Sequence, residues 1–189
     1  LSASNLASSQ IGGSLATAND IYGNGGKNAS VSGAALTARY NYWGTVDEDS
    51  LLLMTTGAVN YSPWTDASHV NVYNTAYQRG LLAGSTHWSG VVKMAGDVLV
   101  PPGASLTLDP GTTVKMLANA SQWDTLGVTA GLCDLIVEGT LRIEGGSAPS
   151  DSVRVLAFKP LQSIAPAAGQ WGSVAFLGAS VDSLCLIQH

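Results

Sequence analysis

Short apolar runs, three to six residues long, recur along the second half of the chain, and glycine, proline, asparagine or aspartate closes each of them. Runs of this length between turn residues are typical of β-strands, and apolar periodicity at helical spacing is nearly absent. The predicted strands span residues 97–100, 105–108, 113–116, 134–137, 140–143, 153–158, 172–176 and 184–187. We therefore expect an all-β protein.

The turns favour a particular way of pairing these strands. They recur every six to ten residues, and tight two-residue hairpin loops of the Asn-Gly type are missing. A chain that turns, runs a short strand and turns again can wind into a solenoid, in which equivalent strands of successive coils pair in parallel. An antiparallel sandwich of similar short strands is the alternative that the pattern leaves open.

One helix is predicted in the N-terminal part. Asp47, Glu48 and Asp49 stand shortly before the apolar run 51–54. Acidic residues at the start of a helix are stabilised by its unpaired backbone N–H groups and by its dipole. We predict a short helix near 47–56, ended by Gly57.

Certain motifs resemble right-handed parallel β-helix proteins, the pectin-lyase-like class of the bacterial and archaeal cell surface. Asn41-Tyr42-Trp43-Gly44, the acidic helix after it and Tyr61-Ser62-Pro63-Trp64 are similar to the closing end of that class, where an aromatic strand and a short helix cover the last coil. Residues 88–90, 97–116, 135–145 and 170–176 are similar to its opening coils. The resemblance implies a right-handed parallel β-helix (β-solenoid) with one short capping helix.

The resemblance also implies a domain organisation. Residues 1–64 would be the last coils and cap of one β-helix, and residues 86–189 the first coils of another, open at its C-terminal end. The polar, weakly patterned residues 65–85 would link them.

In this organisation Leu1 and His189 lie in coils without a cap. An uncapped coil exposes unpaired backbone N–H and C=O groups, which invite another chain. We expect either a piece of a longer tandem protein or a subunit that stacks head to tail on copies of itself.

The composition narrows the classes of partner. The 189 residues include 8 Lys and Arg against 13 Asp and Glu, for a net charge of −5, and only 11% are charged. Such a chain has no basic face for nucleic acid and no polybasic patch for a membrane surface. No run of 18 apolar residues is present to span a bilayer. Few charges and 22 glycines are typical of secreted β-rich proteins, which predicts a secreted or cell-surface location.

Candidate chemistry is sparse. His69, His87 and His189 lie far from any Gly-x-Ser-x-Gly turn, so a Ser–His–Asp triad is not predicted. The cluster formed by Asp47, Glu48 and Asp49 is a weak calcium candidate, because its spacing differs from that of an EF-hand and a helix N-terminus explains it. We expect no catalytic residues, no bound metal and no cofactor.

The remaining candidates are aromatic residues and thiols. Trp64, Trp88 and Trp123 fall in predicted irregular regions, where an exposed ring could stack on a sugar, whereas Trp43 is expected to pack in the core. Cys133 and Cys185 are either two buried free thiols or one disulfide.

These observations predict a non-catalytic extracellular structural β-solenoid. It would serve as a surface scaffold, an adhesin stalk or a filament subunit that assembles end to end through open coils. The alternative is a polysaccharide-binding or polysaccharide-cleaving, lyase-like β-helix. That alternative needs clustered acids and a base on one face, which the sequence does not display.

Overall fold

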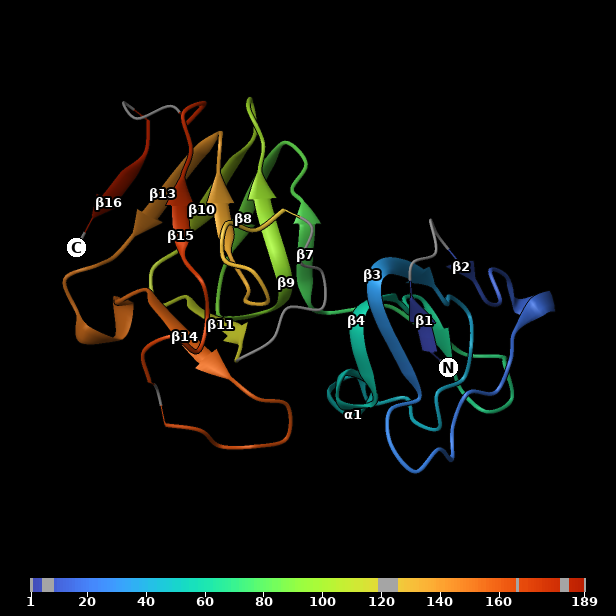
Figure 1. Cartoon of the computed structure of the whole chain (residues 1–189). Helices are drawn as coiled ribbons and strands as arrows, with labels where there is room; N and C mark the ends of the chain where they lie inside the picture. Colours follow the sequence, from blue (N-terminus) through green and yellow to red (C-terminus); the bar gives the residue numbers. More distant parts are fainter. Residues whose placement is uncertain (1, 5–8, 119–125, 166, 181–183, 189) are drawn as a thin grey trace. The chain divides into compact units, whose positions relative to one another are not determined.

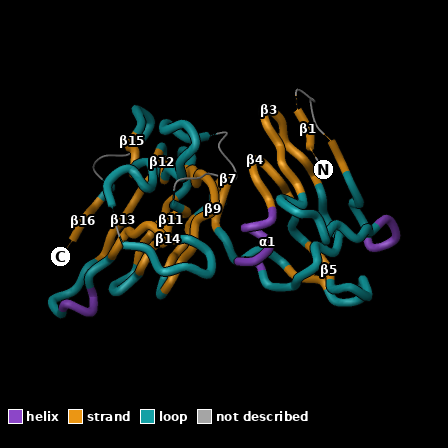
Figure 2. Tube along the Cα trace, turned by 60° about the horizontal axis from the view of Figure 1, so that its bottom comes forward, coloured by secondary structure: helices purple, strands orange, loops and turns teal. Residues whose placement is uncertain are grey.

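The chain forms two compact units, one of residues 1–76 and one of residues 77–189. The computed structural model describes residues 2–4, 9–118, 126–165, 167–180 and 184–188. Strands and loops make up most of both units, and the helices are short (Figures 1 and 2). The division after Ala76 lies inside the segment 65–85 that the sequence analysis assigns to a linker.

The second unit is built from ten strands and a single 3₁₀ turn among its described residues. They are β7 (Gln78–Leu81), β8 (Ser85–Trp88), β9 (Val91–Val100), β10 (Ser105–Leu108), β11 (Thr113–Leu117), β12 (Leu135–Val137), β13 (Thr140–Glu144), η2 (Pro149–Asp151), β14 (Arg154–Phe158), β15 (Val174–Phe176) and β16 (Leu186–Gln188). Each of the eight predicted strands overlaps one of them, so the positions of the strands are confirmed.

These strands form two sheets in which every pair of named strands is parallel. One sheet has the order β16-β13-β10-β8, and the other has the order β14-β11-β9-β12-β15 with β7 also paired to β9. The long strand β9 has three partners, since its first half pairs with β11, its second half pairs with β12, and β7 pairs with residues of both halves. Parallel pairing therefore holds, as the absence of hairpin loops predicts.

The parallel register stacks apolar side chains in columns across the strands. Two such columns cross β9, β12 and β15: Val98, Leu135 and Val174 form one, and Val100, Val137 and Phe176 form the other. The members on β9 and β12 are buried. Burial of each such side chain contributes about 1.5–3 kcal/mol, so these columns form the core of the unit.

Two buried carboxylates lie next to the first of these columns. Asp134 lies one residue before β12, and Asp97 lies one residue before the segment of β9 that pairs with β12. The two residues therefore occupy matched positions, and both are fully buried. The Asp97 carboxylate accepts hydrogen bonds from the backbone N–H of Asp134 at 3.1 Å and of Gly127 at 2.8 Å. The Asp134 carboxylate accepts from the backbone N–H of Thr129 at 2.7 Å and from the N–H and hydroxyl of Ser173 at 2.6 and 2.8 Å. The two carboxylates thus fasten the segment before β12, and the start of β15, to the sheet.

The first unit is a smaller parallel sheet followed by a hairpin. Its elements are β1 (Ser2–Ser4), β2 (Ser9–Gln10), η1 (Leu15–Thr17), β3 (Ala29–Thr37), α1 (Glu48–Met54), β4 (Thr55–Asn60), β5 (Trp64–Thr65) and β6 (Val72–Tyr73). The strands β1, β2 and β4 all pair with β3 in parallel, whereas β5 and β6 pair antiparallel. Residues 41–44 form no strand, and Tyr42 makes only an isolated bridge with Asp20.

The helix predicted near 47–56 is confirmed but is shorter. Asp47 caps it by accepting hydrogen bonds from the Ser50 backbone N–H at 2.8 Å and from the Ser50 hydroxyl at 2.6 Å. The helix ends at Met54, and β4 begins at the next residue. Gly57 is therefore not the helix stop. It lies inside β4 with a φ of 79°, and a Cβ there would collide with the Val31 carbonyl oxygen, so β4 needs glycine at this point.

The prediction of a right-handed parallel β-helix is wrong. The strands are divided among four separate sheets of four, four, six and two strands, one of which is the antiparallel pair β5–β6, and they do not form one continuous helix. The reason is the unequal length of the connections. Four-residue turns carry the chain from β9 to β10 and from β10 to β11, which lie in different sheets, whereas the long connections 118–134 and 159–173 join strands of the same sheet. Successive turns therefore do not repeat as uniform coils.

The turn between β5 and β6 is organised by Asp66. Its carboxylate accepts hydrogen bonds from Asn71 Nδ2 at 2.6 Å, the Ser68 hydroxyl at 2.9 Å and the Val70 backbone N–H at 3.1 Å. These donors, the Asn71 side chain first, lower the pKa of Asp66 from 3.8 to about 2, because they stabilise the ionised form.

The buried carboxylate of Asp134 gives a prediction about stability. In Asp134→Asn, one carboxylate oxygen becomes an NH₂ group that faces a backbone or hydroxyl donor, so at least one hydrogen bond is lost inside the protein. We expect a loss of about 1–3 kcal/mol in the free energy of unfolding, measured by urea denaturation. Glu138→Gln, which removes the same charge at a half-buried position, serves as the control. Equal stability of the two variants would contradict the assigned role of Asp134.

The Asp66 turn gives a prediction about pH. A depressed carboxyl pKa means that the stabilisation is present above about pH 4 and is lost as the pH falls toward about 2. We expect the Val70 and Asn71 amides to keep their protection from hydrogen exchange at pH 4 and to lose it near pH 2. In Asp66→Asn this loss should be absent from the pH profile. A midpoint close to pH 4 in the unaltered protein would refute the prediction.

Candidate functional site

The second unit ends in three edge strands, β14, β15 and β16, which we call the outer strands. Each pairs with one strand only, namely β11, β12 and β13, within the described part of the unit. Figure 1 shows β15 and β16 on the side of the unit that lies away from β7. The outer strands therefore present unpaired backbone N–H and C=O groups along one side of each sheet.

The apolar columns of the core run out at the outer strands and are uncovered there. Val137 is buried in β12, but Phe176, its partner on β15, is 45% exposed. Ile187 on β16 pairs with the half-buried Ile143 of β13 and is 72% exposed. The side chains change from buried to exposed because no further described strand lies over them.

The outer strands carry almost no charge. Their sequences are Arg-Val-Leu-Ala-Phe, Val-Ala-Phe and Leu-Ile-Gln, in which Arg154 is the one charged residue. Natural sheet edges are usually protected from further pairing by charged residues, proline or bulges. A nearly uncharged edge with exposed apolar side chains is suited to adding another strand.

The opposite edges of the same sheets are β8 and β7. On β7, Leu81 is exposed, and on β8 the Nδ1 atom of His87 lies 3.2 Å from the Asp109 carboxylate. Because all pairs in this sheet are parallel, β8 and β16 run in the same direction. A second copy can therefore place its β8 beside β16 in the same parallel sense that the sheet already uses.

The tryptophans singled out from the sequence are not exposed platforms. Trp64 and Trp88 are buried, so neither offers a free ring face for a sugar, contrary to the prediction. Trp64 packs against Tyr61 and Tyr73, and its indole N–H donates to the Val46 carbonyl at 3.3 Å. Trp123 lies outside the described residues. Trp43 is buried, as expected.

The acidic cluster before the helix is engaged in the fold. Glu48 accepts hydrogen bonds from the Tyr61 hydroxyl at 3.1 Å and from the Ala76 backbone N–H at 2.7 Å, while Asp47 caps the helix. In the described ranges no group of three or more His, Cys, Asp or Glu side chains is placed to hold a metal ion. The weak calcium assignment for Asp47, Glu48 and Asp49 gains no support.

One polar cluster was missed by the sequence analysis. The His69 ring lies between two groups: its Nδ1 is 2.9 Å from the Thr65 hydroxyl and its Nε2 is 3.3 Å from the Asp20 carboxylate. The arrangement has the residue types of a hydroxyl–His–acid triad, but Thr65 is fully buried and its hydroxyl cannot reach a substrate. The cluster therefore ties the hairpin to the segment around Asp20. No local sequence pattern points to this cluster, because Asp20 and His69 are far apart in the sequence.

The two thiols and the chain ends complete the list of predicted sites. Cys133 is buried, Cys185 is half-buried, and no disulfide joins them, so of the two alternatives the disulfide is not formed. Leu1 and His189, expected at assembly ends, lie outside the described residues. None of the helices in the described ranges has the length and apolar character needed to cross a membrane.

No family model, curated protein or solved structure matches this chain.

Proposed function

We propose that this protein is a non-catalytic structural module that associates head to tail with further copies of itself by strand addition. The uncovered edge formed by the outer strands is the observation that carries the proposal. There Phe176 and Ile187 are exposed, no further described strand pairs with the backbone groups, and Arg154 is the single charge among the eleven residues.

Strand addition at this edge supplies two kinds of contact. The incoming strand, β8 of the next copy, pairs with the backbone groups of β16, and its side chains cover Ile187 on that strand. Burial of apolar surface contributes about 25 cal/mol per Å², and the low charge of the edge removes the repulsion that usually opposes such pairing. Because the β8 edge and the β16 edge differ, the contact joins unlike surfaces, so it can repeat from one copy to the next.

The non-catalytic part of the proposal rests on how the candidate polar groups are used. Glu48 and Asp47 hold the helix and its surroundings, and His69 contacts a hydroxyl that is buried. These groups have structural partners within the fold. An extracellular role as a scaffold, adhesin stalk or filament subunit rests on composition, since few charges and many glycines are typical of secreted β-rich proteins.

The proposal predicts association that depends on Ile187. The full chain should gain mass with concentration in sedimentation velocity and should form linear assemblies in electron micrographs. In Ile187→Lys, association should weaken at least tenfold, because a charged group replaces an apolar one at the contact; tenfold corresponds to about 1.4 kcal/mol.

Val70→Lys is the matched control, since Val70 is also 72% exposed but lies in the first unit. It should associate like the unaltered protein. A chain that stays monomeric up to its solubility limit would overturn the proposal. Equal weakening by the two substitutions would also overturn it, because the effect would then come from added charge alone.

A further inference from the structure

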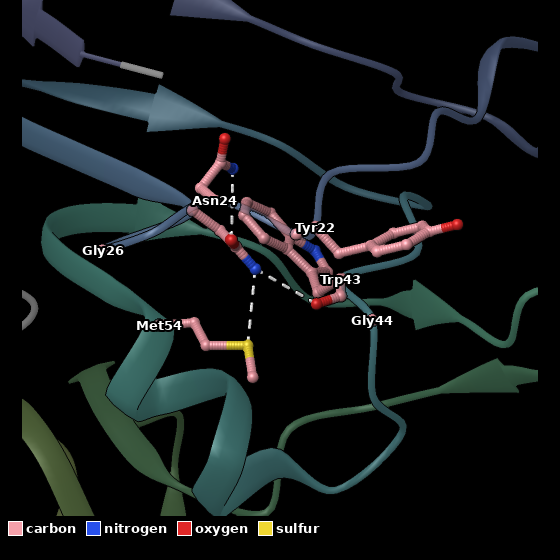
Figure 3. Close-up of a pocket in the computed structure, with 8 residues that line it drawn as sticks. Tyr22, Asn24, Gly26, Trp43, Gly44 and Met54 are labelled. Atoms are coloured by element: carbon pink, nitrogen blue, oxygen red, sulfur yellow. Dashed lines mark hydrogen bonds between the residues drawn. The ribbon is translucent and has the colours of Figure 1, made fainter.

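A preformed pocket lies in the first unit, remote in sequence from the outer strands. Its volume is about 200 Å³, and it lies between the segment 22–28, Trp43 and Gly44, and the end of the helix at Met54. Figure 3 shows Tyr22, Asn24, Trp43 and Met54 gathered around it. Since water occupies about 30 Å³ per molecule in the liquid, the pocket holds a group the size of one small ring rather than a drug-sized ligand.

The pocket wall is held in place by the buried side chain of Asn28. Its Oδ1 accepts a hydrogen bond from Asn24 Nδ2 at 3.2 Å, and its Nδ2 donates to the Trp43 carbonyl at 3.2 Å and contacts Met54 Sδ at 3.4 Å. One amide thus connects the three segments of the wall. A wall that is fixed before binding lowers the cost of ordering it around a ligand.

The aromatic part of the wall is available to a ligand. The ring of Tyr22 is 56% exposed and is held by an edge-to-face contact with Tyr42 at 5.5 Å between ring centroids. Gly44 allows this position, because a Cβ there would lie 2.7 Å from the Tyr22 Cβ. Tyr22 therefore offers a positioned ring at the rim of the pocket.

The polar part of the wall is uncharged. All residues that line the pocket are aromatic, amide, thioether or glycine residues. Asn24 is exposed, and its Oδ1 has no hydrogen-bond partner among the residues that the structure describes. The indole N–H of Trp43 is buried and also lacks a partner there. Because the Trp43 ring has no exposed surface, the Asn24 amide is the polar side chain that the pocket presents to a ligand.

We propose that this pocket binds one uncharged sugar ring of a glycan. The C–H face of a sugar ring packs on an aromatic ring such as Tyr22, and its hydroxyls both donate and accept, which matches the amide of Asn24. The absence of charge from the wall excludes a uronate, whose carboxylate would have no cation to pair with. The pocket is open on one side, so the rest of the glycan extends into solvent.

The test uses the full chain and a panel of neutral oligosaccharides built from glucose, N-acetylglucosamine, mannose, xylose or galactose, with oligogalacturonate as the charged comparator. Binding is measured by isothermal titration calorimetry and by shifts of the Tyr22 and Asn24 amide resonances. We expect at least one neutral oligosaccharide to bind, and Tyr22→Ala and Asn24→Ala each to weaken its affinity at least tenfold. Both residues are exposed, so both variants should keep the thermal unfolding transition of the parent.

Leu15→Ala is the control, since Leu15 is an exposed apolar residue of the same unit that does not line the pocket. It should leave the affinity unchanged. Failure of every neutral oligosaccharide to bind at millimolar concentration would overturn the proposal. So would binding that survives both pocket substitutions, or oligogalacturonate that binds as tightly and depends on Tyr22. Because the pocket and the outer strands lie in different units, these results are independent of the association experiment.

Discussion

In-register parallel pairing of short strands is the constraint on which the second unit depends. Each strand is too short to hold a core alone, so its apolar side chains are buried most completely where matched strands lie on both sides. Leu135 and Val137 satisfy this condition between β9 and β15. Phe176 and Ile187 do not, because β15 and β16 are edge strands. The arrangement that makes the core also leaves an apolar edge where the pairing stops.

The scarcity of charge in this chain has a structural counterpart. Two carboxylates, those of Asp97 and Asp134, are buried, and their oxygens accept backbone hydrogen bonds that hold irregular segments against the sheet. Others are used at the start of the helix and in the Asp66 turn. Few remain to protect the outer strands or to surround the pocket beside Tyr22. The two surfaces proposed for binding are therefore both nearly uncharged, but one offers backbone edges and aliphatic side chains, and the other a ring and an amide.

The errors of the sequence analysis have a common origin. Trp64 and Trp88 fall in regions predicted to be irregular, where we expected exposed rings, yet both are buried, and Trp64 packs between Tyr61 and Tyr73. The continuous β-helix was inferred from turns that look evenly spaced. The connections are in fact unequal, since four-residue turns lead from one sheet to the other while residues 118–134 and 159–173 join strands of the same sheet. In both cases local composition was taken as a guide to long-range packing.

The sequence by itself determined where eight strands of the second unit lie and where the helix begins, and it favoured parallel pairing while leaving an antiparallel sandwich open. Strand length, turn residues and the capping of the helix by Asp47 are local properties, which a few neighbouring residues decide. Only the tertiary structure decided which strands form an uncovered edge, that Asp97 meets Asp134, and that Tyr22, Asn28 and Trp43 surround one pocket. Those outcomes depend on register and on contacts between segments far apart in the chain. Because many registers bury similar apolar area, no short window of sequence selects among them.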